Sequence, residues 1–132
     1  MSSSSVGLIG AGLLGQSIAH CLLQSNETVT GFDIDQQRCL ELVDQGAQTV
    51  QSAADVCQQC RRIFLSLPDS TIVATVVEEI RSQLQAGDII ITPRLAIRVT
   101  HVTSANHLPR TESLTWTPPL LGRVCRFDLA RY

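Results

Sequence analysis

A glycine pattern at residues 10–15 limits what this chain can fold into more than any other feature. The segment GAGLLG follows the apolar run VGLI at residues 6–9 and begins a stretch with helical spacing. A Gly-x-Gly-x-x-Gly pattern is weak evidence alone, but between a strand and a helix it is typical of a dinucleotide-binding turn. The sequence therefore predicts a strand, a phosphate-binding turn and a helix in succession.

Each glycine of this turn has a predicted task. Gly10 permits the tight turn, Gly12 lets a pyrophosphate approach the backbone, and Gly15 lets the helix pack close to the sheet. The helix N-terminus adds unpaired N–H groups and a partial positive charge. We assign the pyrophosphate to six consecutive residues: Gly10, Ala11, Gly12, Leu13, Leu14 and Gly15. A methyltransferase that binds S-adenosylmethionine also has a glycine-rich first turn, but the third glycine favours a dinucleotide.

The first ninety residues alternate between two kinds of segment. Apolar runs rich in β-formers predict strands near residues 5–10, 28–32, 48–50, 62–67 and 88–92. Amphipathic stretches between them predict helices at residues 13–24, 35–43, from 52 onward, and 70–85. With right-handed crossovers, this alternation predicts an α/β fold with a Rossmann-type, doubly wound parallel sheet.

Asp33 lies at the end of the second predicted strand, 18 residues after Gly15. A carboxylate at this position accepts hydrogen bonds from the adenosine ribose hydroxyls and repels a 2′-phosphate. No arginine directly follows it, so we expect NAD in preference to NADP, although the nearby cation Arg38 leaves NADP open. The competing role for Asp33 is a helix cap, but Asp35 is better placed for that task.

Composition narrows the partners and the compartment. The net charge of -2 gives no indication of nucleic acid or an anionic membrane, and no apolar stretch approaches the length of a membrane span. The five cysteines, with no signal peptide before them, predict reduced thiols and a cytoplasmic location. Cys57 and Cys60 form a C-x-x-C pair, but no second pair accompanies them. We therefore expect helix residues there and predict no metal site.

The segment Leu67-Pro68-Asp69-Ser70 makes the match more specific. With the glycine turn and the run GDIII at residues 87–91, it resembles the β-hydroxyacid dehydrogenases, the family of 3-hydroxyisobutyrate and 6-phosphogluconate dehydrogenases. The resemblance covers residues 5–91 and places Leu14 where that family has methionine. It implies that Leu67 and Pro68 lie against the cofactor, although Pro68 also suits a simple strand terminator.

Beyond residue 91 the chain departs from that family. The family's Asp-x-Ser/Thr and Asp-Ala-Pro-x-Ser-Gly-Gly motifs are absent, and the chain contains no lysine to match the family's catalytic one. Residues 1–88 carry four arginines against ten acids, whereas residues 89–132 carry six arginines against two acids. We therefore expect a dinucleotide-binding domain at residues 1–91 and an irregular tail at residues 92–132.

The genetic code offers an explanation for the tail. Read one base out of frame, codons compatible with residues 92–95 yield Asp-Thr-Thr-Thr. The single codon of Trp116 followed by Thr117 must yield Asp, and residues 118–123 permit Ala-Pro-x-Ser-Gly-Ser. Segments that resemble both missing motifs appear in family order, so we expect residues 92–132 to be out of frame; a genuine alternative terminus or a linker is the other explanation.

The function implied by the resemblance is hydride transfer between a nicotinamide cofactor and a small hydroxy acid. We assign no catalytic residue, because the residues that the family uses are missing, and we expect a small-molecule substrate only in a full-length enzyme. Two alternatives stay open: the cofactor domain of an imine reductase, which shares this architecture, and a non-catalytic nucleotide-sensing module.

Overall fold

The computed structural model describes residues 5–92, 95–99 and 111–114. Its elements follow in the order β1 (Ser5–Ile9), α1 (Leu13–Gln24), β2 (Thr28–Phe32), α2 (Gln36–Asp44), β3 (Gln48–Thr49), α3 (Ala53–Gln59), β4 (Arg62–Leu65), α4 (Ser70–Ile80), the 3-10 turn η1 (Arg81–Gln83), β5 (Ile89–Thr92), β6 (Leu95–Val99) and β7 (Thr111–Leu114). The predicted alternation of strand and helix over the first ninety residues is confirmed.

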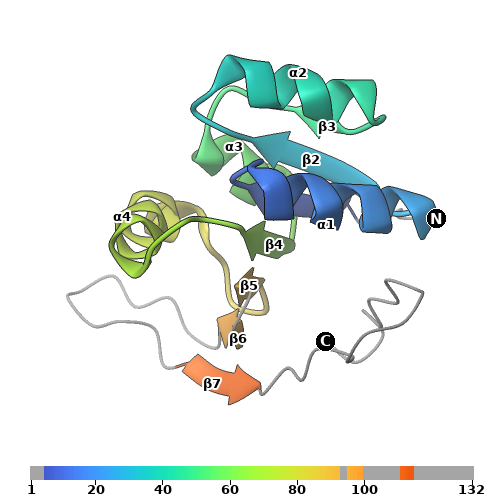
Figure 1. Ribbon diagram of the computed structural model, residues 1–132. Helices are drawn as coiled ribbons and strands as arrows, with labels where there is room; N and C mark the ends of the chain where they lie inside the picture. The colour runs from blue at the N-terminus through green and yellow to red at the C-terminus, as the bar shows by residue number, and fades with distance from the viewer. Residues whose placement is uncertain (1–4, 93–94, 100–110, 115–132) are drawn as a thin grey trace.

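All strands join one sheet in the order β3-β2-β1-β4-β5-β6-β7 (Figure 1). The first five strands pair in parallel. β2 and β3 are added on one side of β1, and β4 and β5 are added on its other side, so the strand order reverses between β3 and β4. The predicted α/β Rossmann-type, doubly wound parallel sheet is therefore confirmed. In such a sheet, ligands bind outside the carboxyl ends of the strands, at the point where the strand order reverses. Here that point lies between β1 and β4.

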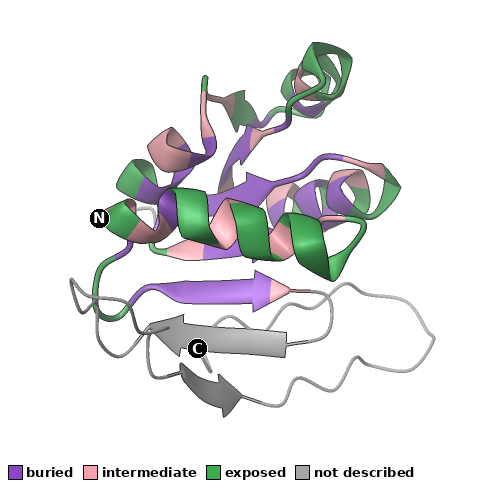
Figure 2. Ribbon diagram, turned by 90° about the vertical axis from the view of Figure 1, so that its left-hand side faces the viewer, coloured by how far each residue is buried: buried purple, intermediate pink, exposed green. Residues whose placement is uncertain are grey.

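The strand residues alternate between two apolar cores, one on each face of the sheet. Leu8, Phe64 and Ile91 belong to the core that α1 covers, together with Leu42 of α2. The other core, beneath α3 and α4, takes the intervening strand residues, including Ile9, Ile63 and Ile90. Buried residues accordingly run through the central strands, while the helices expose their outer faces (Figure 2). This two-sided burial explains why the strands are continuous apolar runs.

Helix boundaries follow local capping chemistry. The Asp35 carboxylate accepts the Gln37 N–H at the start of α2, and the Ser52 hydroxyl accepts the Asp55 N–H at the start of α3. The Asp69 side chain accepts N–H groups from Thr71 and Ile72 at the start of α4. All three caps agree with the sequence, because short polar side chains satisfy the free N–H groups of a first turn.

The last predicted helix is shorter than expected. Residues 70–85 were expected to form one helix, but α4 ends at Ile80 and the chain tightens into the 3-10 turn η1. Such turns are frequent at helix ends, because tighter bonds satisfy the last carbonyl groups. The helical spacing of Leu84 in the sequence therefore reflects its burial and not continued helix.

The expectation of an irregular tail is wrong for residues 95–99 and 111–114. β6 pairs antiparallel with β5, from Thr92↔Leu95 to Ile89↔Arg98, and β7 pairs antiparallel with β6. Without β6, β5 would be an edge strand with a row of unpaired backbone groups. The segment LAIRV contains β-branched residues, which suit a strand at that edge.

Candidate functional site: a dinucleotide cleft at the strand ends

The glycine turn joins β1 to α1 at the carboxyl end of the sheet. Gly10 has a φ of 94°, a conformation that favours glycine, and its N–H donates to the Phe32 carbonyl at 2.9 Å. Gly12 is the N-cap residue of α1, where no side chain caps the helix. The first N–H groups of α1 and the positive end of its dipole are therefore available to an anion.

The three glycines of the turn differ in whether the fold requires them. A Cβ on Gly10 would collide with the Ser66 carbonyl, and a Cβ on Gly15 would collide with the Gly10 carbonyl. A Cβ on Gly12 would meet only the Arg38 guanidinium, at 3.8 Å, and its φ of -70° suits any residue. Gly10 and Gly15 are thus required by the fold. Nothing in the described protein requires glycine at position 12, which leaves its open space for a ligand.

Asp33 follows β2 and faces the glycine turn. It is 9% exposed, and its two carboxylate oxygens accept the Ala11 N–H at 2.7 Å and the Asp35 N–H at 2.8 Å. A carboxylate has about four acceptor positions, so two remain for further donors. The arrangement fixes the Asp33 side chain while leaving it able to accept hydrogen bonds from a ribose diol.

A cavity of about 470 Å³ opens between the glycine turn, the end of β2 and the loop after β4. This volume is in the usual range for a small-molecule site. Its lining comprises Gly10, Gly12, Leu13, Leu14, Asp33, Ile34, Arg38, Ser66, Leu67, Pro68 and Ile72. The structure therefore brings seven of the nine predicted cofactor-binding residues to one cavity.

Ala11 and Gly15 are the two predicted cofactor residues outside the lining. Ala11 is buried and directs its N–H to Asp33, so that group is already engaged. Gly15 lies behind the turn, against the Gly10 carbonyl. Both residues shape the site from behind its surface.

Four lining residues were not among the predicted cofactor-binding residues: Ile34, Ser66 and Ile72, which the sequence analysis did not mention, and Arg38, which it named only as a nearby cation. Ile34 is 92% exposed, which is unusual for a large apolar side chain. Leu13, which also lines the cavity, is 90% exposed. Apolar rims suit the flat faces of a nucleotide base, and the position of Ile34 directly after Asp33 was a usable signal.

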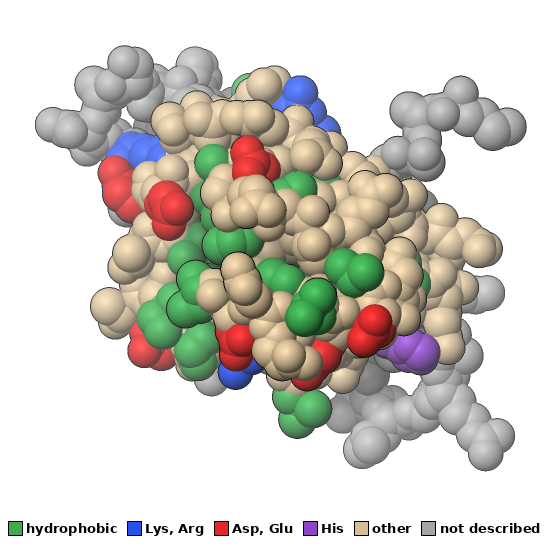
Figure 3. Space-filling view, turned by 90° about the horizontal axis from the view of Figure 1, so that it is seen from above, with side chains coloured by type: hydrophobic (Ala, Val, Ile, Leu, Met, Phe, Trp, Pro, Cys, Tyr) green, Lys and Arg blue, Asp and Glu red, His purple; other side chains and the backbone are tan. Residues whose placement is uncertain are grey.

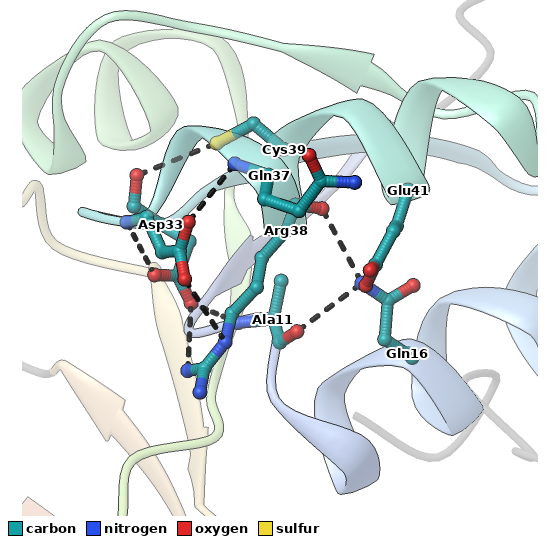
Figure 4. A network of polar contacts seen from close by, with 8 residues as sticks. Ala11, Gln16, Asp33, Gln37, Arg38, Cys39 and Glu41 are labelled. Atoms are coloured by element: carbon teal, nitrogen blue, oxygen red, sulfur yellow. Dashed lines mark hydrogen bonds and ion pairs between the residues drawn. The ribbon is translucent and has the colours of Figure 1, made fainter.

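A polar network ties the glycine turn to α2 (Figure 4). The Gln16 side-chain amide donates to the Ala11 carbonyl at 3.2 Å and to the Arg38 carbonyl at 3.3 Å. It also contacts Glu41 and Gln45. The Arg38 guanidinium lies 3.7 Å from an Asp33 oxygen and 3.8 Å from an Asp35 oxygen.

The face of the molecule seen from above in Figure 3 carries acidic and apolar side chains next to one another.

The C-x-x-C pair lies on the other side of the sheet. Cys57 is inside α3 and Cys60 ends it, and both side chains are buried. Burial, and secondarily the Asp88 carboxylate, raises the pKa of the Cys57 thiol from 9.0 to about 12. Thiolate, the nucleophilic and metal-binding form, is therefore disfavoured at Cys57. No group of His, Cys, Asp and Glu side chains suited to a metal ion occurs among the described residues.

The expectation about thiols holds in part. Cys39, Cys57 and Cys60 are free thiols, whereas Cys21 is disulfide-bonded, contrary to the prediction. The odd number of cysteines in the sequence had argued for reduced thiols throughout, but number alone does not show which side chains approach each other. Within the described part of the chain, no helix is long and apolar enough to cross a lipid bilayer.

Residues 5–101 match the family described as the NAD binding domain of 6-phosphogluconate dehydrogenase. The chain belongs to this family. The resemblance inferred from the glycine turn and the Leu-Pro segment is thereby confirmed, and with it the assignment of an NAD-binding domain.

Individual proteins with similar sequences or structures agree with this family assignment. 2-(Hydroxymethyl)glutarate dehydrogenase from Eubacterium barkeri is 35% identical over 92 residues, which cover 67% of this chain and 31% of that protein. Mitochondrial 3-hydroxyisobutyrate dehydrogenase from Bos taurus is 36% identical over 69 residues, which cover 52% of this chain and 20% of that protein. The solved structure of a Streptomyces aurantiacus imine reductase is 27% identical with a TM-score of 0.62, covering 67% of this chain and 31% of that one. The chain thus spans less than a third of the length of each.

Proposed function

We propose that this domain binds NAD(H) in the cavity at the carboxyl ends of β1, β2 and β4. The pyrophosphate would lie over Gly12 and the α1 N-terminus. The Asp33 carboxylate would accept hydrogen bonds from the adenosine ribose hydroxyls. Leu13, Leu14, Leu67 and Pro68 would form the apolar walls. NAD would be preferred to NADP because the Asp33 carboxylate repels a 2′-phosphate. We propose no nucleic-acid or membrane partner, and a cytoplasmic setting. The free thiols of Cys39, Cys57 and Cys60 support that setting, whereas the disulfide of Cys21 does not.

We further propose that a full-length form transfers hydride between the nicotinamide and a small hydroxy acid. The support is the identity to 2-(hydroxymethyl)glutarate and 3-hydroxyisobutyrate dehydrogenases. The cofactor supplies the hydride chemistry, and these residues bind and orient it. An imine as substrate is the second candidate, supported by the similarity to an imine reductase. Residues 92–132 remain proposed to be out of frame, which sequencing the codons for residues 88–95 tests directly.

The observation that carries the binding proposal is the open space beside Gly12. Nothing in the described protein requires glycine at this position. Gly12→Ala adds a methyl group that the described protein accommodates, 3.8 Å from Arg38, but that occupies the approach of a pyrophosphate. Overpacking of this kind costs about 1–3 kcal/mol, so NAD affinity should fall at least about fivefold. The thermal unfolding midpoint should stay near that of the unmodified chain.

Titration calorimetry with NAD on both proteins measures the effect. Gln24→Ala, an exposed change at the other end of α1, is the matched control and should leave the affinity unchanged. Equal NAD affinity for Gly12→Ala and the unmodified chain, or no NAD binding by the unmodified chain, would overturn the proposal.

A further inference from the structure

We propose that Gln16 is a positioning residue: its side chain holds the glycine turn in register with α2, so that the pyrophosphate half and the ribose half of the cleft are aligned before a dinucleotide binds. This inference rests on the proposed dinucleotide site. Gln16 lies in the first turn of α1 and is not part of the cavity lining. It therefore acts through the groups that it holds and not by touching the cofactor.

The first observation is the bond from Gln16 to the glycine turn. Its Nε2 donates to the Ala11 carbonyl at 3.2 Å, and the Ala11 N–H donates to the Asp33 carboxylate at 2.7 Å. The Ala11–Gly12 peptide is trans and planar, so its carbonyl and its N–H point in opposite directions. By holding the Ala11 carbonyl, Gln16 sets the direction of the Gly12 N–H, a group of the proposed pyrophosphate site.

The second observation is that the same side chain reaches α2. The Gln16 Nε2 also donates to the Arg38 carbonyl at 3.3 Å (Figure 4). The amide further contacts Glu41 and Gln45, so it reaches along two turns of the helix. α2 lies wholly within the described part of the chain, and Leu42 is its one buried residue. With a single buried side chain to fix it, α2 depends on these polar contacts for its position against α1.

Together these bonds close a ring around the ribose half of the cleft. The Asp35 N–H donates to the second Asp33 oxygen at 2.8 Å, and Asp35 is the N-cap residue of α2. The ring therefore runs from Gln16 to Ala11, through Asp33 and α2, and back to Gln16. A ligand that contacts both the glycine turn and Asp33 gains from this alignment, because less conformational freedom is lost on binding. A ligand that contacts Asp33 alone gains little from it.

The test compares the dissociation constants of NAD and adenosine, measured by NMR titration, for the unmodified chain, Gln16→Met and Gln16→Glu. Both variants keep the length and helix preference of the side chain and lose its amide donors. NAD spans the turn and Asp33, so its dissociation constant should rise about tenfold, the equivalent of about 1.4 kcal/mol. Adenosine has no phosphate, so its constant should stay within about twofold. Gln24→Met makes the same change at the far end of α1, beside His20, and should alter neither constant.

The outcomes separate this inference from the binding proposal. An unmodified chain that binds neither compound contradicts the dinucleotide site itself. One that binds NAD without adenosine contradicts the ribose role of Asp33 and this inference with it. Equal changes in both constants, an unchanged NAD constant, or loss of folding in both Gln16 variants overturns the positioning role alone. A purely structural role lowers the unfolding midpoint without moving the ratio of the two constants.

Discussion

Replacing Asp33 by asparagine is the sharpest test of how this site works. Asp33 is nearly buried, and each of its oxygens accepts one backbone N–H, from Ala11 and from Asp35. Asparagine has nearly the same shape but only one accepting oxygen. Its amide NH₂ must face one of the two N–H donors, which leaves that donor without a partner.

The structure gives a magnitude for each consequence. A buried donor without a partner costs about 1–3 kcal/mol, so the free energy of unfolding of Asp33→Asn should fall by that amount. Hydrogen bonds to a charged group contribute about 1.5–3 kcal/mol, so loss of the carboxylate from the ribose site should weaken NAD binding about tenfold to a hundredfold. The two effects have separate causes and need not be equal.

Urea unfolding measures the first effect and titration calorimetry with NAD measures the second. Asp35→Asn is the matched control, because Asp35 is half exposed and asparagine caps α2 as well as aspartate does. It should change both quantities little. If Asp33→Asn is less stable but binds NAD as tightly as the unmodified chain, Asp33 only supports the turn and its proposed ribose role is refuted.

Three further predictions follow from burial, thiol chemistry and the missing family motifs. Leu42→Ala should lower the free energy of unfolding in urea by about 2–5 kcal/mol, because Leu42 is fully buried and packs against Gly31. Leu40→Ala, at an exposed position on the same helix, is the control, and an equal loss in both variants would contradict the packing. The raised pKa of Cys57 means that the folded state disfavours its thiolate, so this contribution to stability is present below pH 9 and is lost as pH rises toward 12. Unfolding curves across that range should show a steeper decline than those of Cys57→Ala, and parallel declines would refute the assignment. The 132-residue chain with NAD and a panel of small hydroxy acids should give no increase in NADH absorbance, because the family's catalytic lysine is absent; turnover that disappears in Gly12→Val would show otherwise.

Local chemistry made much of this structure predictable from the sequence. The glycine turn, the continuous apolar strands and the polar caps Asp35, Ser52 and Asp69 each act within a few residues, so their consequences are visible in the order of residues. The same local pattern identified most of the cavity lining, because the carboxyl ends of parallel strands always meet at one edge.

The tertiary structure decided what depends on residues distant in sequence. Only the approach of Ser66 to Gly10 and of Gly10 to Gly15 separates the glycines that the fold requires from Gly12, which it leaves open for a ligand. The pairing of β6 with β5 was equally invisible, because an open sheet edge recruits a strand from whatever segment lies beside it. The place of Arg38 between the glycine turn and Asp33 also required the folded chain, since α2 comes to the turn only through the sheet order and the Gln16 bridge. Spacing in the sequence records the local rules, whereas the distance between side chains on different elements is set by how those elements pack.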